Sequence, residues 1–442
     1  MVRYQPPKEW QQWVEWLAAG LHGRSRWRLS LILLGIVFAR GRRTVTSWLR
    51  AVGIGDDFAD YYYFLQPLGR KSKELAQRLF SLLLVRLVSG ERVLLAVDDT
   101  PTKRYGPQVQ GAGIHHNPTP GPADQKFLYG HVWVTISLVL RHPLWRTIGL
   151  PLLGLLYVRA KDVGKIPKQH GWQFRTKLEL AVRPLLRLIP LATAAGKTVW
   201  VVADGAYAKR PFLRPLRTEG VTVVSRLRKD AALRTVPSRS KAPQRGRPRK
   251  YGPQRIHLAR RAAHPSGWQQ VACLAYGQQS VKTFKTFLAT YRPANGLIRV
   301  MIVKEDHGCE FFFCTDPDAT PREIIETFAD RAAIEQDFHD VKDVWGAGQQ
   351  QVRNVWTNVA VYNLNLWAQT LVESWAWNKP AEEIRDRDDS PWDNPQRRPS
   401  HADRRKALRR EILHNEYSSL TAAHRLSSKI RRLYHSLLQL AV

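Results

Sequence analysis

The sequence predicts an α/β protein whose mixed β-sheet is covered by helices on both faces. Two observations carry this prediction. In several segments apolar residues recur every three or four positions, which is typical of amphipathic helices, whereas other short apolar runs bounded by turn residues are typical of strands. After residue 88 these strand-like runs alternate with helical segments, so that crossover helices are needed to return the chain to one sheet.

The predicted elements have a definite order. Residues 1–88 are expected to be helical, because helical spacing recurs in WQQWVEWLAAGL and KSKELAQRLFSLLLVRLV. Strands are predicted at RVLLAVDDT, HVWVTISLVLRH and WRTIGLPLLGLLYV, followed by a helix from Trp172 to Leu191. The strand TVWVVADGAY, a short helix from Pro211 and the strand VTVVSRLR complete the series. The order β-β-β-α-β-α-β is that of an RNase H-like core, although several α/β folds share parts of it.

The second half of the chain predicts an insertion and further helices. Residues 226–261 hold thirteen Lys or Arg and one acid, and the strand-like runs WQQVACLAY, FKTFLATYR, LIRVMIVKE and CEFFFCTD follow. A helix is expected from about Pro321 to Trp345 and another from Asn354 to Trp377. Between Trp377 and His401 the sequence is charged and rich in proline, as in a linker, and a basic helical tail begins at Ala402.

The charge balance indicates a nucleic-acid partner. The chain has 69 Lys plus Arg against 37 Asp plus Glu, a formal net charge of +32. Such an excess favours a polyanion as partner, and DNA or RNA is expected to bind with an affinity that falls steeply with salt. No apolar run reaches the length of a membrane span, and an odd, small number of cysteines fits a reducing compartment. The sequence therefore predicts a cytoplasmic protein that associates with nucleic acid.

One face of the predicted helix in FADRAAIEQDFHDVK collects the residue types of an active site. At about 100° per residue, the residues that fall within about 80° of one another are Phe328, Arg331, Glu335, His339 and Lys342. Glu335 is the only carboxylate on this stripe, because the neighbouring acids of the helix point away. The helix alone also fits a solvated face with ion pairs between successive turns.

Two aspartates elsewhere in the sequence favour the active-site interpretation of this helix over the solvated face. Asp99 and Asp204 each follow an apolar strand, VLLAVDD and TVWVVAD, and the carboxyl ends of such strands are where α/β folds place their active sites. A cluster of buried carboxylates needs a cation, and a pair of Mg²⁺ ions about 3.5–4 Å apart performs in-line displacement at phosphodiesters. Asp98 would replace Asp99 if the strand register were shifted, because neighbours on a strand face opposite sides.

These residues resemble a known family. The spacing Phe328-x2-Arg331-x3-Glu335-x6-Lys342 is similar to the Y-R-E-K motif of bacterial cut-and-paste DDE transposases of the insertion-sequence superfamily numbered four. The segment LLAVDDTPTKRYG resembles that family's first aspartate motif and selects Asp99, and VVADGAY resembles its second. The resemblance covers roughly residues 90–350. It implies an RNase H-like core, a mostly β insertion before the last catalytic helix, and a catalytic triad of Asp99, Asp204 and Glu335.

The resemblance also implies cofactors and partners. The triad would bind two Mg²⁺ ions per active site, with Mn²⁺ as an alternative, and Arg331 and Lys342 would hold DNA phosphates. The substrates would be double-stranded DNA, namely the terminal inverted repeats and the target, and the enzyme would work as a homodimer near the bacterial nucleoid. His339 would orient a carboxylate or a water. Phe328 stands where the motif has tyrosine, so the hydroxyl expected to reach a phosphate is absent.

Two DNA contacts are expected outside the triad. The family's β insertion stacks a flipped base on an aromatic ring, for which the sequence offers several candidates without choosing among them, namely Trp268, Tyr276, Phe284, Phe287 and Tyr291. The segment containing Arg245, Arg247 and Arg249 resembles the core of an AT-hook, which lies in the minor groove of A·T-rich DNA. A flexible basic loop without sequence preference explains the same segment equally well.

The sequence thus predicts a five-part enzyme. The parts are a helical DNA-binding domain at 1–88, the first part of the RNase H-like core at 89–228, a basic loop and β-rich insertion at 229–318, the last part of the core with the catalytic helix at 319–378, and a linker with a helical basic tail at 379–442. The predicted function is cut-and-paste transposition by cleavage and strand transfer. The alternatives are an RNase H-like DNA nuclease or resolvase without strand transfer, and a catalytically silent DNA-binding protein descended from a transposase.

Overall fold

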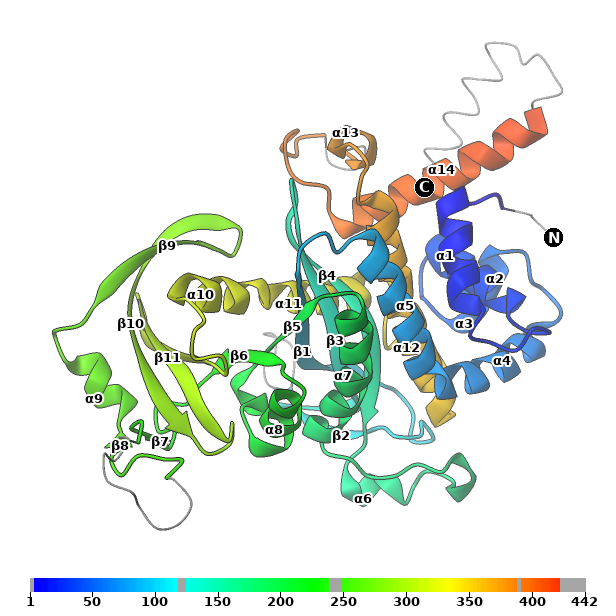
Figure 1. Cartoon of the computed structure of the whole chain (residues 1–442). Helices are drawn as coiled ribbons and strands as arrows, with labels where there is room; N and C mark the ends of the chain where they lie inside the picture. The colour runs from blue at the N-terminus through cyan, green and yellow to red at the C-terminus, as the bar shows by residue number, and fades with distance from the viewer. Residues whose placement is uncertain (1–3, 118–124, 238–248, 388–390, 422–442) are drawn as a thin grey trace.

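One continuous mixed sheet organises the molecule. The computed structural model describes residues 4–117, 125–237, 249–387 and 391–421 (Figure 1). The strand order is β2-β3-β1-β5-β6-β12-β11-β10-β7-β8, with β4 paired to β3 and β9 paired to β10. Figure 1 shows the N-terminal helices at one end of this sheet and the strands β9–β11 at the other, so the two flank the central strands.

The central strands reproduce the predicted order. Their bounds are β1 Arg92–Lys103, β3 Phe127–His142, β4 Arg146–Tyr157, β5 Thr198–Ala203 and β6 Thr222–Arg226. β1 pairs with β5 and β5 with β6 in parallel, whereas β3 is antiparallel to both β1 and β4. The fold-class prediction is therefore confirmed: this is a mixed α/β protein with an RNase H-like core. One strand, β2 (Gly113–His116), lies in a segment where the sequence predicts a loop.

The predicted insertion consists of antiparallel strands that prolong the core sheet. They are β7 Leu233–Arg234, β8 Arg255–Ile256, β9 Gln269–Ala275, β10 Gln278–Tyr291, β11 Gly296–Glu305 and β12 Gly308–Cys314, and α9 (Leu258–Ala263) precedes β9. β12 pairs with β6, and this pairing joins the insertion to the core. The insertion is therefore an extension of the sheet that starts beside the strand following Asp204.

Helices cover both faces of the core. Those between β4 and β6 are α6 Ala160–Val163, the 3-10 turns Lys168–His170 and Gly205–Tyr207, α7 Lys177–Ala194 and α8 Arg210–Thr218. The helix α7 starts five residues later than predicted, because Thr176 and Glu179 form a capping box there. The helices after the insertion are α10 Pro321–Asp330, α11 Ala332–Asp343, α12 Val355–Ala376 and α13 Ala381–Ile384. The single helix predicted from Pro321 to Trp345 is thus two helices, interrupted at Arg331.

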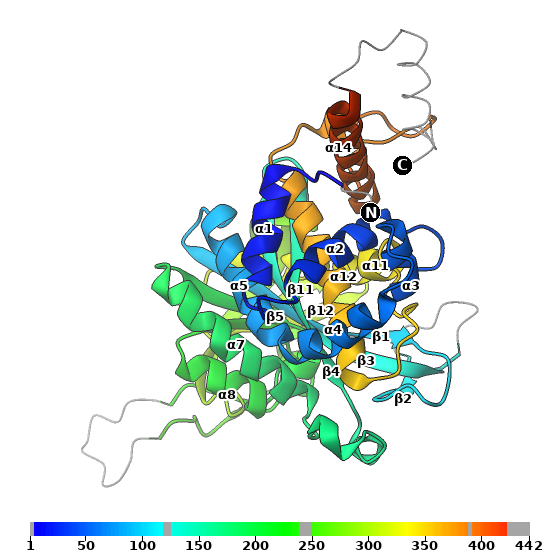
Figure 2. The same ribbon diagram turned by 90° about the vertical axis from the view of Figure 1, so that its right-hand side faces the viewer.

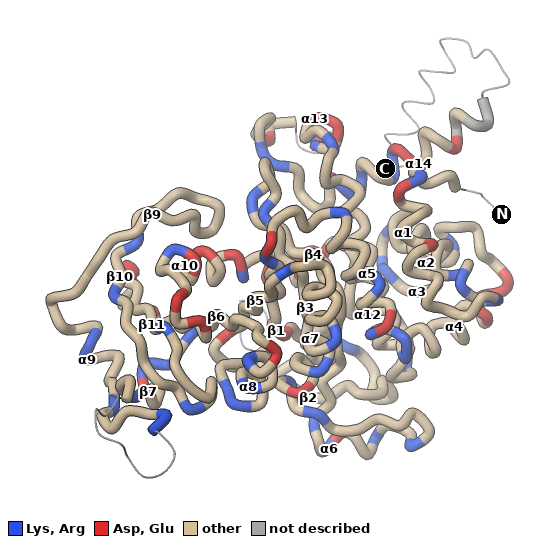
Figure 3. The backbone as a smooth tube through the Cα atoms, viewed as in Figure 1, with Lys and Arg blue, Asp and Glu red and all other residues tan. Residues whose placement is uncertain are grey.

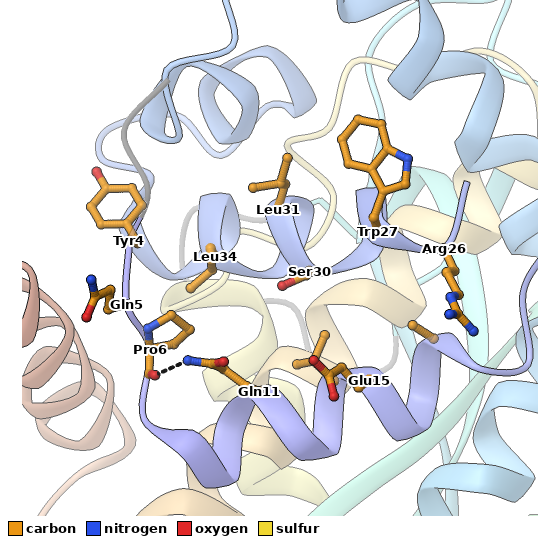
Figure 4. A pocket seen from close by; sticks show the side chains of 12 residues that line it. Tyr4, Gln5, Pro6, Gln11, Glu15, Arg26, Trp27, Ser30, Leu31 and Leu34 are labelled. Carbon is orange, nitrogen blue, oxygen red and sulfur yellow. Dashed lines mark hydrogen bonds between the residues drawn. The ribbon is translucent and has the colours of Figure 1, made fainter. Parts of the chain in front are cut away.

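The predicted N-terminal helical region is also present. Its helices are α1 Lys8–Ala18, α2 Trp27–Phe38, α3 Val45–Ala51, α4 Phe58–Arg70 and α5 Ser72–Arg86 (Figure 2). A cavity between α1 and α2 is lined by residues such as Gln11, Glu15, Trp27 and Leu34 (Figure 4). No residue of β1, β5 or α11 lines it, so this cavity is separate from the acidic residues singled out by the sequence. Within the described ranges, no helix has the length and apolarity that a membrane crossing requires.

The last described helix, α14 (His401–Thr421), fastens the N-terminal helices to the core. Arg405 is buried and donates to three carbonyl oxygens at the end of α2, those of Ile36, Val37 and Ala39, and to that of Val344 after α11. Free carbonyls at a helix end carry partial negative charge, which a guanidinium offsets. One arginine therefore joins three segments that are far apart in the sequence.

A buried acid on α12 holds the start of the same helix. Glu373 accepts hydrogen bonds from His401 Nδ1 at 2.5 Å and from Arg404 Nη1 at 2.9 Å, and the indole N–H of Trp345 donates to His401 Nε2 at 2.8 Å. Burial raises the pKa of Glu373, but Arg404 and His401 outweigh it and hold that pKa below the ordinary value. Because all these groups are buried, each depends on the others for its hydrogen bonds.

We predict that Glu373→Leu lowers the free energy of unfolding by about 3–5 kcal/mol, since it leaves Arg404 buried without its partner. Chemical denaturation with circular dichroism measures this. The depressed pKa means that the stabilisation is present above the ordinary glutamate pKa of 4.5 and is lost as the pH falls below it. A Glu373→Leu protein as stable as the wild type at pH 7 would show that the network contributes nothing.

Candidate active site

Strand β1 points alternate side chains at two differently covered faces of the sheet. Leu95 and Val97 are buried in the large core that includes α7 and α8, whereas Ala96 is buried in the smaller core that includes α10 and α11. Because successive residues of a strand face opposite sides, Asp98 continues the series of Ala96 and Asp99 the series of Val97. Asp98 therefore lies on the α11 face and Asp99 on the α7 face.

Strand β5 adds a second acid to the α11 face. Trp200 and Val202 belong to the smaller core, and Asp204 is the next residue of that series. The parallel pairing of β1 with β5 ends at Val97 and Ala203, so Asp98 and Asp204 follow side by side. Asp204 begins the turn Gly205–Tyr207 and accepts a hydrogen bond from the backbone N–H of Ala206 at 3.4 Å.

Arg331 links Asp98 to Glu335. One guanidinium nitrogen, Nη1, lies 2.7 Å from Asp98 Oδ2, and the other, Nη2, lies 2.6 Å from Glu335 Oε1. Arg331 stands at the interruption between α10 and α11, and its side chain is 13% exposed, against 58% for Glu335. The break in the helix thus carries the residue that joins α11 to the end of β1.

Asp99 has different partners. Its Oδ2 lies 2.6 Å from Nζ of Lys177, the first residue of α7, and the hydroxyl of Tyr207 donates to its Oδ1 at 3.3 Å. The structure therefore holds Asp99 across the sheet from Arg331 and Glu335, the residues with which the family motif groups it. Lys177 and Tyr207 were not singled out by the sequence, because nothing in their spacing marks them.

The electrostatic environment distinguishes Asp98 from an ordinary surface acid. The pKa of Asp98 is raised to about 6, mainly by burial and also by the neighbouring charges of Asp99 and Asp204. Arg331 and the backbone N–H of Asp99 act in the opposite direction but do not restore the ordinary value. A carboxylate that remains short of positive charge, even with an arginine beside it, is a position where a further cation would be stabilised.

The acids on this face have the chemistry of a divalent-cation site, but they are arranged around an arginine. Carboxylate oxygens are the ligands that Mg²⁺ prefers, and Asp98, Asp204 and Glu335 supply only such oxygens. In the part of the chain that the structure describes, no group of three or more His, Cys, Asp or Glu is gathered closely enough to hold a metal ion. Arg331 lies between Asp98 and Glu335, so the donor types fit a cation provided that Arg331 moves.

Three other acids of α10 and α11, Asp330, Asp337 and Asp340, point away from Glu335, as the helical spacing predicts. Asp330 pairs with Arg141 at 2.8 Å, and Asp337 accepts a hydrogen bond from the hydroxyl of Ser137 at 2.8 Å. Both partners lie on β3, and burial raises the pKa of Asp337 well above its ordinary value. Asp340 is buried too. These acids therefore belong to the packing of α10 and α11 on the sheet.

The remaining residues of the predicted stripe are spread along α11. His339 lies 3.2 Å from Asp340 and 2.9 Å from Asp343, so its ring is directed at those carboxylates and not at Glu335. Lys342 is half-buried, and burial lowers its pKa. Phe328 lies in the core with its ring centroid 4.6 Å from that of Phe312, so the phenylalanine of the motif is a packing residue here.

The predicted basic segment is described only at its end. Arg245 and Arg247 lie outside the described residues, and Arg249 is exposed. The AT-hook resemblance therefore stays a prediction.

Among the candidate stacking aromatics, Tyr276 is the most exposed. It occupies the two-residue turn between β9 and β10 with φ of +53°, and 63% of its surface is exposed. Partial burial and the charge of Glu310 raise its pKa, while the charges of Arg331 and Arg226 lower it. Phe284 and Tyr291 are buried, and the rings of Trp268 and Phe287 lie under Lys285 and Arg261.

A comparison of the sequence with known protein families gives a match over most of the chain. A family model described as DDE superfamily endonuclease matches residues 17–289, which is more than half of the chain. The matched range contains Asp98, Asp99 and Asp204 and ends before Glu335. Among curated proteins, none matches the chain significantly.

Proposed function

We propose that this chain, which belongs to the DDE superfamily endonucleases, is the DNA transposase of an insertion sequence. It would bind terminal inverted repeats, cleave the DNA strands there and join the freed 3′-ends to target DNA. The observation that carries this proposal is the bridge from Arg331 to Asp98 and Glu335 on the face that Asp204 shares. An endonuclease of this superfamily acts on DNA and generally requires a divalent metal.

We further propose that Asp98, and not Asp99, is the first member of the triad. Asp98 and Asp204 follow neighbouring parallel strands on the α11 face, and Glu335 reaches that face through Arg331. Bound divalent ions supply activation of the attacking water or 3′-hydroxyl and stabilisation of the leaving oxygen. The three carboxylates would hold two such ions, Mg²⁺ or Mn²⁺.

Arg331 and Asp99 would have supporting roles. When its carboxylate partners bind cations, the guanidinium of Arg331 is free to pair with a DNA phosphate, for which its planar fork is suited. The backbone N–H of Asp99 donates to Asp98 Oδ1 at 2.8 Å, and Lys177 fixes the side chain of Asp99 on the far face. Asp99 is therefore a positioning residue that orients Asp98.

Tyr276 is our proposal for the aromatic ring that stacks on a DNA base. An unpaired base stacks on an exposed aromatic ring with a gain of about 1–3 kcal/mol. The positive φ of Tyr276 is unusual for a tyrosine, and the turn holds the ring on the solvent side of the hairpin. The charge of Arg331, which pairs with Asp98 and Glu335, acts on the phenol of Tyr276, and this supports a place for the stacked base on the side of the acidic residues.

The first prediction separates the two neighbouring aspartates. Asp98→Asn should reduce Mg²⁺-dependent cleavage by on the order of 10³-fold, as expected when a group that acts in the transition state is lost. Asp99→Asn, the matched control, breaks a partly exposed ion pair and should change the rate by less than about tenfold.

The assay uses a plasmid that carries the DNA flanking the gene on both sides, with precut ends to score joining. Equal losses in the two variants, or a loss only in Asp99→Asn, would contradict our choice of Asp98. Cleavage without joined product would favour a nuclease or resolvase, and binding without cleavage by the wild type would favour the catalytically silent alternative.

The second prediction concerns the ring of Tyr276. Tyr276→Ala should weaken binding of precut ends with an unpaired terminal base by about 1–3 kcal/mol, while Tyr276→Phe should bind as the wild type does. Fluorescence of 2-aminopurine at the terminal position reports the stacking directly. If both variants quench the fluorophore equally, Tyr276 is not the stacking residue.

A further inference from the structure

A group of basic side chains lies where α5 meets α7, on the opposite side of the sheet from α11. Its members are Lys73 on α5, Arg175 just before α7, and Arg183 and Arg187 on α7 (basic residues are blue in Figure 3). The helices α5 and α7 are in contact and lie next to each other in Figures 1 and 2. Residues 183 and 187 are one helical turn apart, so they share a face of α7.

Around these four cations, positive charge exceeds negative charge in the described part of the chain. None of them forms an ion pair or a side-chain hydrogen bond there. The nearest acid on α7, Glu179, accepts hydrogen bonds from the backbone and hydroxyl of Thr176 at 2.9 and 3.0 Å. Glu74 on α5 lies 3.4 Å from Lys71. The charge of Glu179 also acts on Arg175 and Arg183, but one carboxylate does not balance four cations.

The four cations also repel one another. Lys73 is half-buried, and burial lowers its pKa, as do the charges of Arg175, Arg187 and Arg183. The pKa of Arg175 is likewise lowered by burial and by Arg183, and the charge of Glu179 opposes this only in part. Like charges this close destabilise the free protein, and a bound polyanion removes that penalty.

We propose that Lys73, Arg175, Arg183 and Arg187 form a surface that binds the phosphate backbone of duplex DNA. The four cations come from two helices and the segment before α7, and a run of backbone phosphates supplies several negative charges to match them, whereas a single small anion does not. The surface is separate from the candidate active site, and it begins close to Lys177, whose partner Asp99 adjoins Asp98. DNA lying along α7 would thus lead toward the carboxyl ends of β1 and β5. This inference rests on the proposed function in taking DNA as the ligand.

The test measures binding of the full chain to a labelled duplex of arbitrary sequence over a range of salt concentrations. Each phosphate contact contributes about 0.9 to the slope of log affinity against log salt, so Arg183→Gln/Arg187→Gln should lower the slope by about 1.8. The thermal unfolding temperature without DNA should rise or stay unchanged, because repulsion is relieved. A purely structural role for the arginines predicts a fall instead.

Two controls sharpen the result. Arg183→Lys/Arg187→Lys keeps the charges and should keep the slope, and Arg86→Gln removes an exposed arginine from the far end of α5 and should leave it unchanged. An unchanged slope in the glutamine double variant, or an equal fall in Arg86→Gln, would overturn the proposal. Failure of the wild type to bind any duplex would instead count against the proposed function, so the two failures are distinguishable.

Discussion

The alternation of side chains along β1 is the constraint on which the site depends. The strand lies inside the sheet with one core on each side, so an exchange of faces would put Leu95 and Val97 in the smaller core and Ala96 in the larger one. The same alternation assigns the two adjacent aspartates that follow to opposite faces. Asp98 meets the break between α10 and α11 through Arg331, and Asp99 meets the start of α7 through Lys177.

The two sides of the sheet each carry an excess of charge: negative on the α11 face and positive where α5 meets α7. On the α11 face, burial and neighbouring carboxylates leave Asp98 short of positive charge although Arg331 is beside it. On the α5–α7 side, burial and three arginines leave Lys73 short of negative charge. A protein that binds cations on one face and a polyanion on the other would have both imbalances relieved by its ligands. In that view stability is given up locally where binding is required.

The sequence predicted the elements better than their contacts. Strand order, the insertion and the helix carrying Glu335 follow from apolar periodicity, because that periodicity is what buries the core. The choice of Asp99 came from motif resemblance. Because Ala96 and Val97 are both buried, the apolar pattern of the strand does not show which aspartate faces α11. The break at Arg331 and the pairing of Lys177 with Asp99 depend on tertiary contacts between distant segments, and local sequence does not encode them. For the same reason only the fold could separate the exposed Tyr276 from the buried aromatics around it.

The central claim is that Asp98 and Asp204 hold a divalent cation once Arg331 moves. The most direct measurement is a crystal structure of the full chain with Mn²⁺, located by its anomalous scattering. Our account predicts manganese bound by the carboxylates of Asp98 and Asp204 on the α11 face, with the guanidinium of Arg331 no longer on Asp98. Manganese bound instead by Asp99, with Lys177 displaced and the pair of Arg331 and Asp98 intact, would contradict it.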